Sequence, residues 1–192
     1  MHNTFWGIEH LFGSITRTRL LRIFLSNPAE AYFVRDLSRR ISTQLNAVRR
    51  ELDNLENLGI VKSEATSQKK FYRLDQANFL FPELKALLTK SQLFFEKNLG
   101  QAVDKLGQVQ LLALTGRFTG LKESPVDMLI VGRVNRDDLK KIIVLLQNDF
   151  GEQINYTVMT QKEYNYRRQV TDKFLLSTLS QKKITLIDRL AS

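Results

Sequence analysis

The sequence predicts an α+β protein with two folded parts joined by a long helix. Near the amino terminus, two segments with helical periodicity precede two strand-like segments, the order of a helix-turn-helix with a two-stranded wing. In the middle, apolar residues keep roughly helical spacing from Phe81 to Leu106. Beyond Gly107, apolar strand-like runs alternate with amphipathic helical runs, as in a small α/β domain. We therefore expect domains at 1–78, 79–107 and 108–192, the middle one being the linking helix.

The composition excludes several classes of protein and of binding site. The chain has 192 residues, 43% hydrophobic residues and no cysteine, which allows a sizeable core and excludes disulfides and thiolate metal sites. The two histidines, His2 and His10, have no carboxylate pattern around them, so we expect no metal site. MHNTFWGIEH lacks the features of a signal peptide, and no apolar run is long enough to span a bilayer. These observations predict a cytoplasmic protein without a membrane segment.

The charge favours a polyanionic partner. The formal net charge is +9 and the pI is about 9.9, but the excess is spread along the chain. The local pattern is more informative, since five arginines between Arg35 and Arg50 face a single acid, Asp36. This run falls within the predicted helix-turn-helix.

The first helix is expected within 11–26, with Ser14 or Thr16 as its amino-terminal cap. Its apolar residues, which should face a core, are Ile15, Leu20, Leu21, Phe24 and Leu25. Asn27-Pro28 ends the helix. The short segment Ala31-Tyr32-Phe33 is expected to be extended and to pair with the wing as a third strand.

The helix-turn-helix begins at Val34. Ser42-Thr43 forms its turn, at a place where glycine is more usual. The second helix buries residues spaced by three and four, namely Leu45, Val48, Leu52, Leu55 and Leu58. Its open side carries Thr43, Asn46, Arg50, Asp53 and Asn57, with Ala47 and Arg49 at the margins. Glu51 and Glu56 are expected on the later turns, and Gly59 stops the helix.

Amide and guanidinium groups on an open helix face can bind base edges and phosphates, so the sequence predicts a contact with double-stranded DNA. The wing is expected at 60–65 and 69–74, with a polar tip at 66–68. The candidate DNA-binding residues are Arg39, Arg40, Thr43, Gln44, Asn46, Ala47, Arg49, Arg50, Lys69 and Lys70. Each charged candidate could instead be an ordinary solvated side chain that does not contact DNA. Arg39 and Arg40 could instead form ion pairs with Glu51 or Glu56.

The long helix has a wide apolar stripe, which Gly100 can interrupt. Such a stripe is expected to pack on a neighbouring surface, within the chain or in a second copy. We therefore expect a homodimer with the helix from Pro82 to Leu106 as its interface.

The last domain is predicted from three strands, at 109–116, 126–132 and 154–159, and from an amphipathic helix at 136–150. Further helical pieces are KEYNYRRQ and TDKFLLSTLS, and ITLIDRL closes the chain. A turn with Gly116, Arg117 and Gly120 can expose N–H groups to an anion, although such a glycine spacing is weak evidence. Asp127 is expected to be a turn or cap residue. The basic-aromatic cluster of Tyr164, Tyr166, Arg167 and Arg168 is expected to be a packed helix surface rather than an RNA site.

The first 80 residues resemble winged-helix repressors of the ArsR type, through LFGSITRTRLLRIFLSNP, FVRDLSRRI and NAVRRELDNLENLGIV. The resemblance implies a winged helix-turn-helix that binds DNA. Metal-sensing members of that family use cysteine and histidine ligands, and since this chain has no cysteine, metal sensing does not carry over.

LTGRFTGLKESPVDMLIVG resembles the small nucleotidyltransferases, minimal relatives of the polymerase-beta fold. Those proteins carry Gly-Ser at a strand-to-helix turn, Asp-x-Asp on the next strand and a third acid on a later strand. Here Gly116 matches the glycine, Arg117 replaces the serine, and Pro125 and Asp127 align with the two aspartates. The nearest polar candidate for the third acid is Asn155. The resemblance therefore implies a nucleotidyltransferase-like domain with no catalytic residue, metal or cofactor.

The leading functional hypothesis is a sequence-specific DNA-binding transcriptional regulator, whose effector is unknown. One alternative is an active nucleotidyltransferase with the winged helix as a targeting module. Another is an antitoxin-like partner protein. Together, the two parts resemble bacterial regulators that place a winged helix ahead of a nucleotidyltransferase-like domain.

Overall fold

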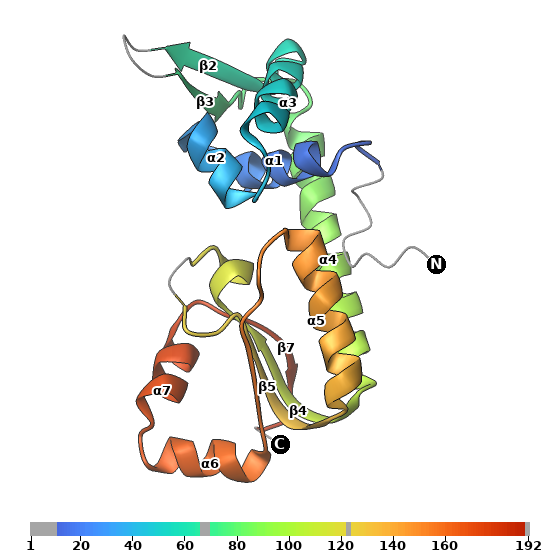
Figure 1. The fold of residues 1–192 in the computed structure, drawn as a ribbon, viewed down its shortest axis with the longest axis vertical. Coiled ribbons are helices and arrows are strands. Elements are labelled where there is room, and N and C mark those ends of the chain that lie inside the picture. Colours follow the sequence, from blue (N-terminus) through green and yellow to red (C-terminus); the bar gives the residue numbers. More distant parts are fainter. Residues whose placement is uncertain (1–10, 66–69, 122–123, 191–192) are drawn as a thin grey trace. The chain divides into compact units, whose positions relative to one another are not determined.

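The computed structural model describes residues 11–65, 70–121 and 124–190, which fall into two compact units. The amino-terminal unit contains the described residues up to Phe94 together with 150–152, and the carboxy-terminal unit contains 95–149 and 153–190. The long helix α4 (Phe81–Asp104) contributes its first part to one unit and its second part to the other. Figure 1 labels the helices and strands of both units along the chain.

The amino-terminal unit has the predicted helix-turn-helix and wing. Its elements, in order, are α1 (Ile15–Ser26), β1 (Ala31–Phe33), α2 (Val34–Arg40), α3 (Leu45–Asn57), β2 (Val61–Ala65) and β3 (Lys70–Leu74). The three strands form an antiparallel sheet in the order β1-β3-β2, with Tyr32 and Ser63 both opposite Tyr72. The prediction that Ala31–Phe33 joins the wing as a third strand is confirmed.

Helix α1 begins as its sequence predicts. The Ser14 hydroxyl caps it by accepting a hydrogen bond from the Arg17 N–H at 3.2 Å. Leu20 and Phe24 are fully buried, but Ile15 is 56% exposed, so its assignment to the core is wrong. At 100° per residue, Ile15 lies on the side of the helix opposite to that stripe.

The turn between α2 and α3 is held by its own polar groups. The Ser38 hydroxyl donates to the Thr43 carbonyl at 2.6 Å, and the Thr43 N–H donates to the Ser38 carbonyl at 3.1 Å. Ser42 has φ of 49°, in the left-handed region that glycine adopts without steric cost. The expectation that glycine would be more usual here therefore has a conformational reason.

Replacing Ser42 with glycine is expected to raise the free energy of unfolding by about 0.5–1 kcal/mol. The left-handed conformation costs an L residue roughly 1–2 kcal/mol, and the greater freedom of glycine in the unfolded chain offsets about half of that. Ser42→Val should lower stability, because a β-branched side chain tolerates this conformation least. Urea titration with hydrogen exchange at buried amides of α2 and α3 measures both changes, and equal stability of the two variants would contradict the prediction.

Helix α3 ends at a glycine, as predicted. Gly59 has φ of 67° and donates its N–H to the Glu56 carbonyl at 2.9 Å, while the Ile60 N–H bonds to the Leu55 carbonyl at 2.9 Å. Leu58 is 56% exposed, so its place in the buried stripe is wrong. It is the carboxy-terminal cap of the helix, where the chain turns away from the core.

One apolar core unites the amino-terminal unit. Its fully buried side chains, at 0% exposure, are Leu20, Phe24, Leu37, Val48, Leu52 and Leu55. Phe81, Leu84 and Leu88 from the start of α4 pack against it. Helix α4 runs without a break through Gly100, so the interruption considered at that residue does not occur.

The carboxy-terminal unit has the predicted alternation of strands and helices. Its elements are β4 (Gly107–Leu114), the short 3-10 helix η1 (Gly116–Thr119), β5 (Met128–Val134), α5 (Arg136–Phe150), β6 (Tyr156–Met159), α6 (Gln161–Gln169), α7 (Lys173–Ser180) and β7 (Ile184–Asp188). The sheet order is β6-β5-β4-β7, with β5 and β6 parallel and the other neighbours antiparallel. The first strand starts two residues earlier than predicted, and Gly116 lies beyond it in η1.

Both faces of this sheet are covered. Leu111, Ala113, Leu129 and Val131 form a core with Tyr164 of α6 and Leu175 of α7. The alternate strand residues, among them Leu112, Leu114, Met128 and Ile130, are also fully buried. Figure 1 shows α5 and α7 on opposite sides of the strands. Burial on both faces explains why these strands are apolar almost without interruption.

Candidate functional site

The outward face of α3 presents the polar side chains that the sequence placed there. Asn46, Arg49 and Arg50 are exposed, as is Gln44 at the start of the helix, whereas Ala47 is half-buried. Val48, Leu52 and Leu55, all at 0% exposure, anchor the opposite side in the core. Because helical residues advance by 100°, burial of that side orients the polar side to solvent.

Arg49 and Arg50 are available for an external partner. Within the described parts of the chain, neither guanidinium has a hydrogen bond or an ion pair. Each carries five N–H donors in a planar fork that fits phosphate or the edge of guanine. Half-buried Thr43 lies one step before Gln44 and uses its hydroxyl to donate to the Ile41 carbonyl at 3.0 Å.

Arg39 and Arg40 lie on α2 with contacts other than those considered from the sequence. The Arg39 guanidinium bonds Asp36 at 2.5 Å, and Arg40 lies 5.0 Å from the centre of the Tyr32 ring. The alternative that they pair with Glu51 or Glu56 is therefore wrong. Both side chains remain exposed, so phosphate contacts are sterically open to them.

Glu51 is buried, at 4% exposure, rather than exposed on the outward face of α3. Its side chain accepts hydrogen bonds from the Ser14 hydroxyl at 2.7 Å, Arg17 Nε at 2.9 Å and Asn54 Nδ2 at 3.3 Å. Burial opposes ionisation, but the bonds from Ser14, Asn54 and Arg17 outweigh it and lower the pKa of Glu51. Glu51 lies on a later turn of α3, as expected, but there it ties α3 to α1, a contact that the sequence did not predict. Its position three residues after Val48 and four before Leu55 was the sequence signal for burial.

Glu56 joins α3 to the wing. Its carboxylate accepts hydrogen bonds from the Ser63 N–H and hydroxyl, and from Lys70 Nζ at 3.3 Å. The bonds from Ser63, and then those from Lys70, lower the pKa of Glu56. The Lys70 ammonium also lies 4.8 Å from the centre of the Tyr72 ring, and its contacts with Tyr72 and Glu56 raise the pKa of Lys70. Lys70 therefore has two partners within the unit. Lys69 and the tip at 66–68 lie outside the described residues.

Asp127 closes a turn in the carboxy-terminal unit. Its side chain is 4% exposed, and its two oxygens accept the N–H groups of Arg117 at 3.0 Å and Asn155 at 2.9 Å. Gly116 has φ of 51°, and a Cβ at that position would collide with Asp127 Oδ1. Asp127 is thus a turn residue, as its sequence position predicted, and it also ties η1 to the approach to β6.

The same turn uses its own backbone donors. The Arg117 N–H bonds Asp127, while Phe118, Gly120 and Leu121 donate to carbonyls of residues 115–117. The candidate anion site at Gly116, Arg117 and Gly120 rested on exposed N–H groups. Because these four groups have acceptors within the turn, that premise does not hold for them.

No protein-family model and no curated protein matches the chain. Among solved structures, it is similar to the crystal structure of the MarR family transcriptional regulator SPO1453 from Silicibacter pomeroyi DSS-3. The identity is 17% and the TM-score is 0.41, and the similarity covers 50% of this chain and 68% of the other.

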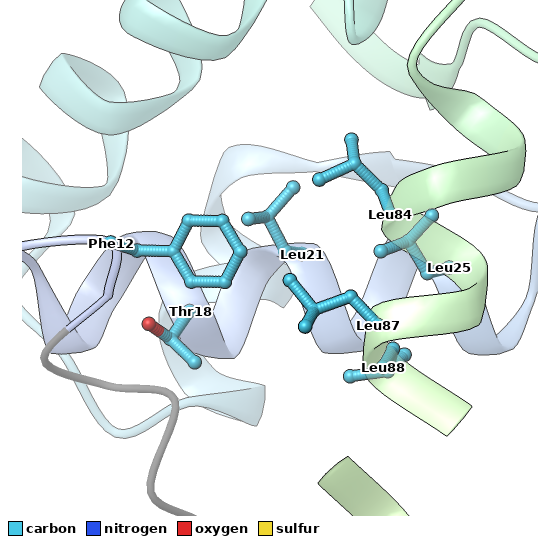
Figure 2. A pocket seen from close by; sticks show the side chains of 7 residues that line it. All are labelled: Phe12, Thr18, Leu21, Leu25, Leu84, Leu87 and Leu88. Carbon is cyan, nitrogen blue, oxygen red and sulfur yellow. The ribbon is translucent and has the colours of Figure 1, made fainter. Parts of the chain in front are cut away.

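A small hollow lies between α1 and α4 in the amino-terminal unit. Figure 2 shows its lining, in which Leu84, Leu87 and Leu88 of α4 face Phe12 and residues of α1. Its volume of about 10 Å³ is about the minimum for one water molecule, and its walls offer almost no polar partner. We interpret it as a packing seam between two helices rather than a site for an organic effector.

The described residues form neither a cluster of metal ligands nor a membrane-spanning helix. Outside the gaps at 1–10, 66–69, 122–123 and 191–192, no group of three or more histidine, aspartate or glutamate side chains is placed to hold a metal ion. None of the helices described is both long and apolar enough to cross a membrane.

Proposed function

We propose that this protein is a sequence-specific DNA-binding transcriptional regulator, in which α3 enters the major groove and the wing contacts the backbone. The observation that carries the proposal is the outward face of α3. It combines exposed amides with two unpaired arginines on a helix whose other side is anchored in the core. This is the chemistry and placement that a recognition helix requires.

The proposed roles follow from position. Asn46 and Arg50 are one helical turn apart and would bind base edges, with Thr43, Gln44, Ala47 and Arg49 beside them. Arg39 and Arg40 on α2 would bind phosphates. Lys70 would exchange its contact with Glu56 for a phosphate, and Lys69 is proposed to act alongside it. The winged-helix resemblance of the ArsR type supports this assignment from sequence.

Selection from a pool of duplex DNA tests the proposal. The full chain should enrich a common sequence motif, and its affinity should fall steeply with salt, since phosphate contacts release counterions. Binding without an enriched motif would remove the claim of sequence specificity. The enriched motif would give the operator sequence.

We further propose a homodimer through α4. One helix-turn-helix contacts few base pairs, and two copies double the site. Leu93 and Phe94 on α4 are 61% and 53% exposed, which leaves apolar surface for a second copy. Light scattering at micromolar concentration should give twice the 22.3 kDa monomer mass, with or without DNA. A monomer under both conditions would contradict the proposal.

The carboxy-terminal unit is proposed to be a nucleotidyltransferase-like domain that has lost catalysis and serves association or regulation. The order of β4, η1, β5, α5 and β6 supports the fold resemblance. Magnesium-dependent nucleotidyl transfer needs carboxylates held beside the triphosphate. Here Pro125 stands for the first aspartate, and both oxygens of Asp127 already accept backbone N–H groups.

Labelled nucleoside triphosphates with magnesium should therefore give no incorporation into the protein, a partner or a small molecule. Incorporation by the native chain that disappears in Asp127→Asn would establish the rival function, an active nucleotidyltransferase. An antitoxin-like role would be indicated if pulldown from the native cell captured a toxin in a complex that lacked DNA.

A further inference from the structure

Helix α6 has an exposed stripe that the winged helix does not use. Lys162, Asn165, Tyr166 and Gln169 follow the spacing of residues on one side of a helix, and all four are exposed. Tyr166 is 64% exposed, whereas Tyr164 on the other side is only 6% exposed and packs into the core of the sheet. The interpretation of this region as a packed helix surface is thus confirmed for Tyr164 and wrong for Tyr166.

The acidic groups nearest this stripe are already paired. Arg167 bonds Glu163 at 2.8 Å and lies 3.5 Å from Asp172, and Asp172 also caps α7. One arginine thus holds both carboxylates of the segment 161–180. They are directed to Arg167 rather than to the other cations.

Three cations of the same segment have no such partner. Within the described residues, Lys162, Arg168 and Lys173 take part in no ion pair, and all three are exposed. The Arg168 guanidinium lies 5.9 Å from the centre of the buried Tyr164 ring, and the residue remains exposed. The outward side of α6 and its margin therefore carry uncompensated positive charge beside an exposed aromatic ring.

We propose that this stripe is a second nucleic-acid-binding surface, which takes an unpaired strand with a base stacked on Tyr166. Lys162 and Arg168 would bind its phosphates, and the amides of Asn165 and Gln169 would bind base edges or sugar hydroxyls. Positive charge with an exposed ring is the combination that single strands require, because an unpaired base has a free face for stacking. An acidic protein would need the cations but would gain little from Tyr166 or the amides.

The proposal does not depend on the winged helix, so the test first weakens that surface by removing its two unpaired arginines. The full chain carrying Arg49→Ala and Arg50→Ala is titrated with a labelled oligo-dT or oligo-U of roughly 12 nucleotides at low salt. Saturable binding is expected, and Tyr166→Ala in this background should weaken it about tenfold, as expected for loss of one base-aromatic stack. Arg168→Ala should flatten the salt dependence of binding.

Lys140→Ala with Lys141→Ala is the matched control in the same unit. These exposed lysines of α5 are paired with Asp137 and Asp138, so their loss should change the affinity less than about twofold. All the replaced side chains are exposed, so each variant is expected to keep the fold.

Three results would overturn the proposal. They are absence of binding in the Arg49→Ala, Arg50→Ala background, an unchanged affinity in Tyr166→Ala, and displacement of the strand by polyglutamate as efficient as by unlabelled oligo-dT. The last result would indicate an acidic protein partner. Loss of duplex selection in Arg49→Ala, Arg50→Ala tests the winged-helix function separately, so each proposal can fail without the other.

Discussion

Arg50→Ala is expected to weaken binding to the selected duplex by about 1–3 kcal/mol, or roughly 5- to 150-fold. Arg50 is exposed on the early turns of α3 and has no internal acceptor among the described residues. A bidentate contact with guanine would therefore be lost without being replaced from within the protein. Discrimination between the selected duplex and a scrambled one should fall with it, as measured by fluorescence anisotropy on both.

Arg73→Ala is the matched control for charge. Arg73 is also exposed and lies on the wing, but it pairs with Glu64. Its removal should leave the preference for the selected duplex unchanged. Lys70→Ala should instead weaken binding to all DNA sequences alike. It should also reduce the slope of log affinity against log salt concentration by about one, as expected for a phosphate contact. Equal affinities of wild type and Arg50→Ala for both duplexes would show that α3 does not enter the groove.

Glu51→Ala is expected to lower the free energy of unfolding of the amino-terminal unit by about 2–3 kcal/mol. The substitution removes the acceptor for Ser14 and Arg17, and the Arg17 side chain is only 29% exposed. Charged hydrogen bonds contribute about 1.5–3 kcal/mol, and breaking a fully buried ion pair costs more than breaking this half-buried one. Urea titration followed by hydrogen exchange at the buried amides of α1 and α3 measures the loss.

Asp53→Ala provides the control, since Asp53 is an acid on the same helix that is exposed and has no ion pair among the described residues. Its effect should remain within about 0.5 kcal/mol, as for ordinary surface substitutions. If the two variants lose the same stability, Glu51 does not hold α3 to α1.

The Glu51 network also predicts a pH dependence. Its folded pKa is lowered, so the stabilisation is present above the unfolded value of about 4.3 and is lost as the pH falls through the folded pKa. In Glu51→Gln, the free energy of unfolding should fall less as the pH is lowered. Some of the fall should remain, because the pKa of Glu56 is lowered too. An acid profile identical to that of the wild type would contradict the assignment.

Local periodicity was sufficient for most of the fold. The spacing of Val48, Leu52 and Leu55 correctly predicted the buried side of α3, and Gly59 correctly predicted its end. The alternation of apolar strands with the helix at 136–150 likewise predicted the carboxy-terminal unit. These features depend on residues within one or two helical turns of each other, which a sequence displays directly.

The misplaced Ile15 and Leu58 are local errors at helix ends, whereas the partners that the sequence missed are residues far apart in the chain. Glu51 was considered as a partner of Arg39 or Arg40, but the fold brings Ser14 and Arg17 of α1 to it across more than thirty residues. The phosphate contact predicted for Lys70 stays a prediction, but the sequence did not indicate that the fold pairs this lysine with Glu56 of α3. In each case the sequence specifies the side chain and its face, whereas the partner depends on how the elements pack.

The two candidate binding surfaces, on α3 and on α6, also differ in how far the sequence alone defines them. The open face of α3 follows from helical spacing alone, because its buried side is a long, regular apolar stripe. The open face of α6 does not, since Tyr164 and Tyr166 are chemically identical and two residues apart. Packing of Tyr164 against the sheet turns Tyr166 outward, and the pairing of Arg167 with Glu163 and Asp172 leaves the neighbouring cations uncompensated. Short helices have too few turns for periodicity to define a side, so tertiary packing assigns it.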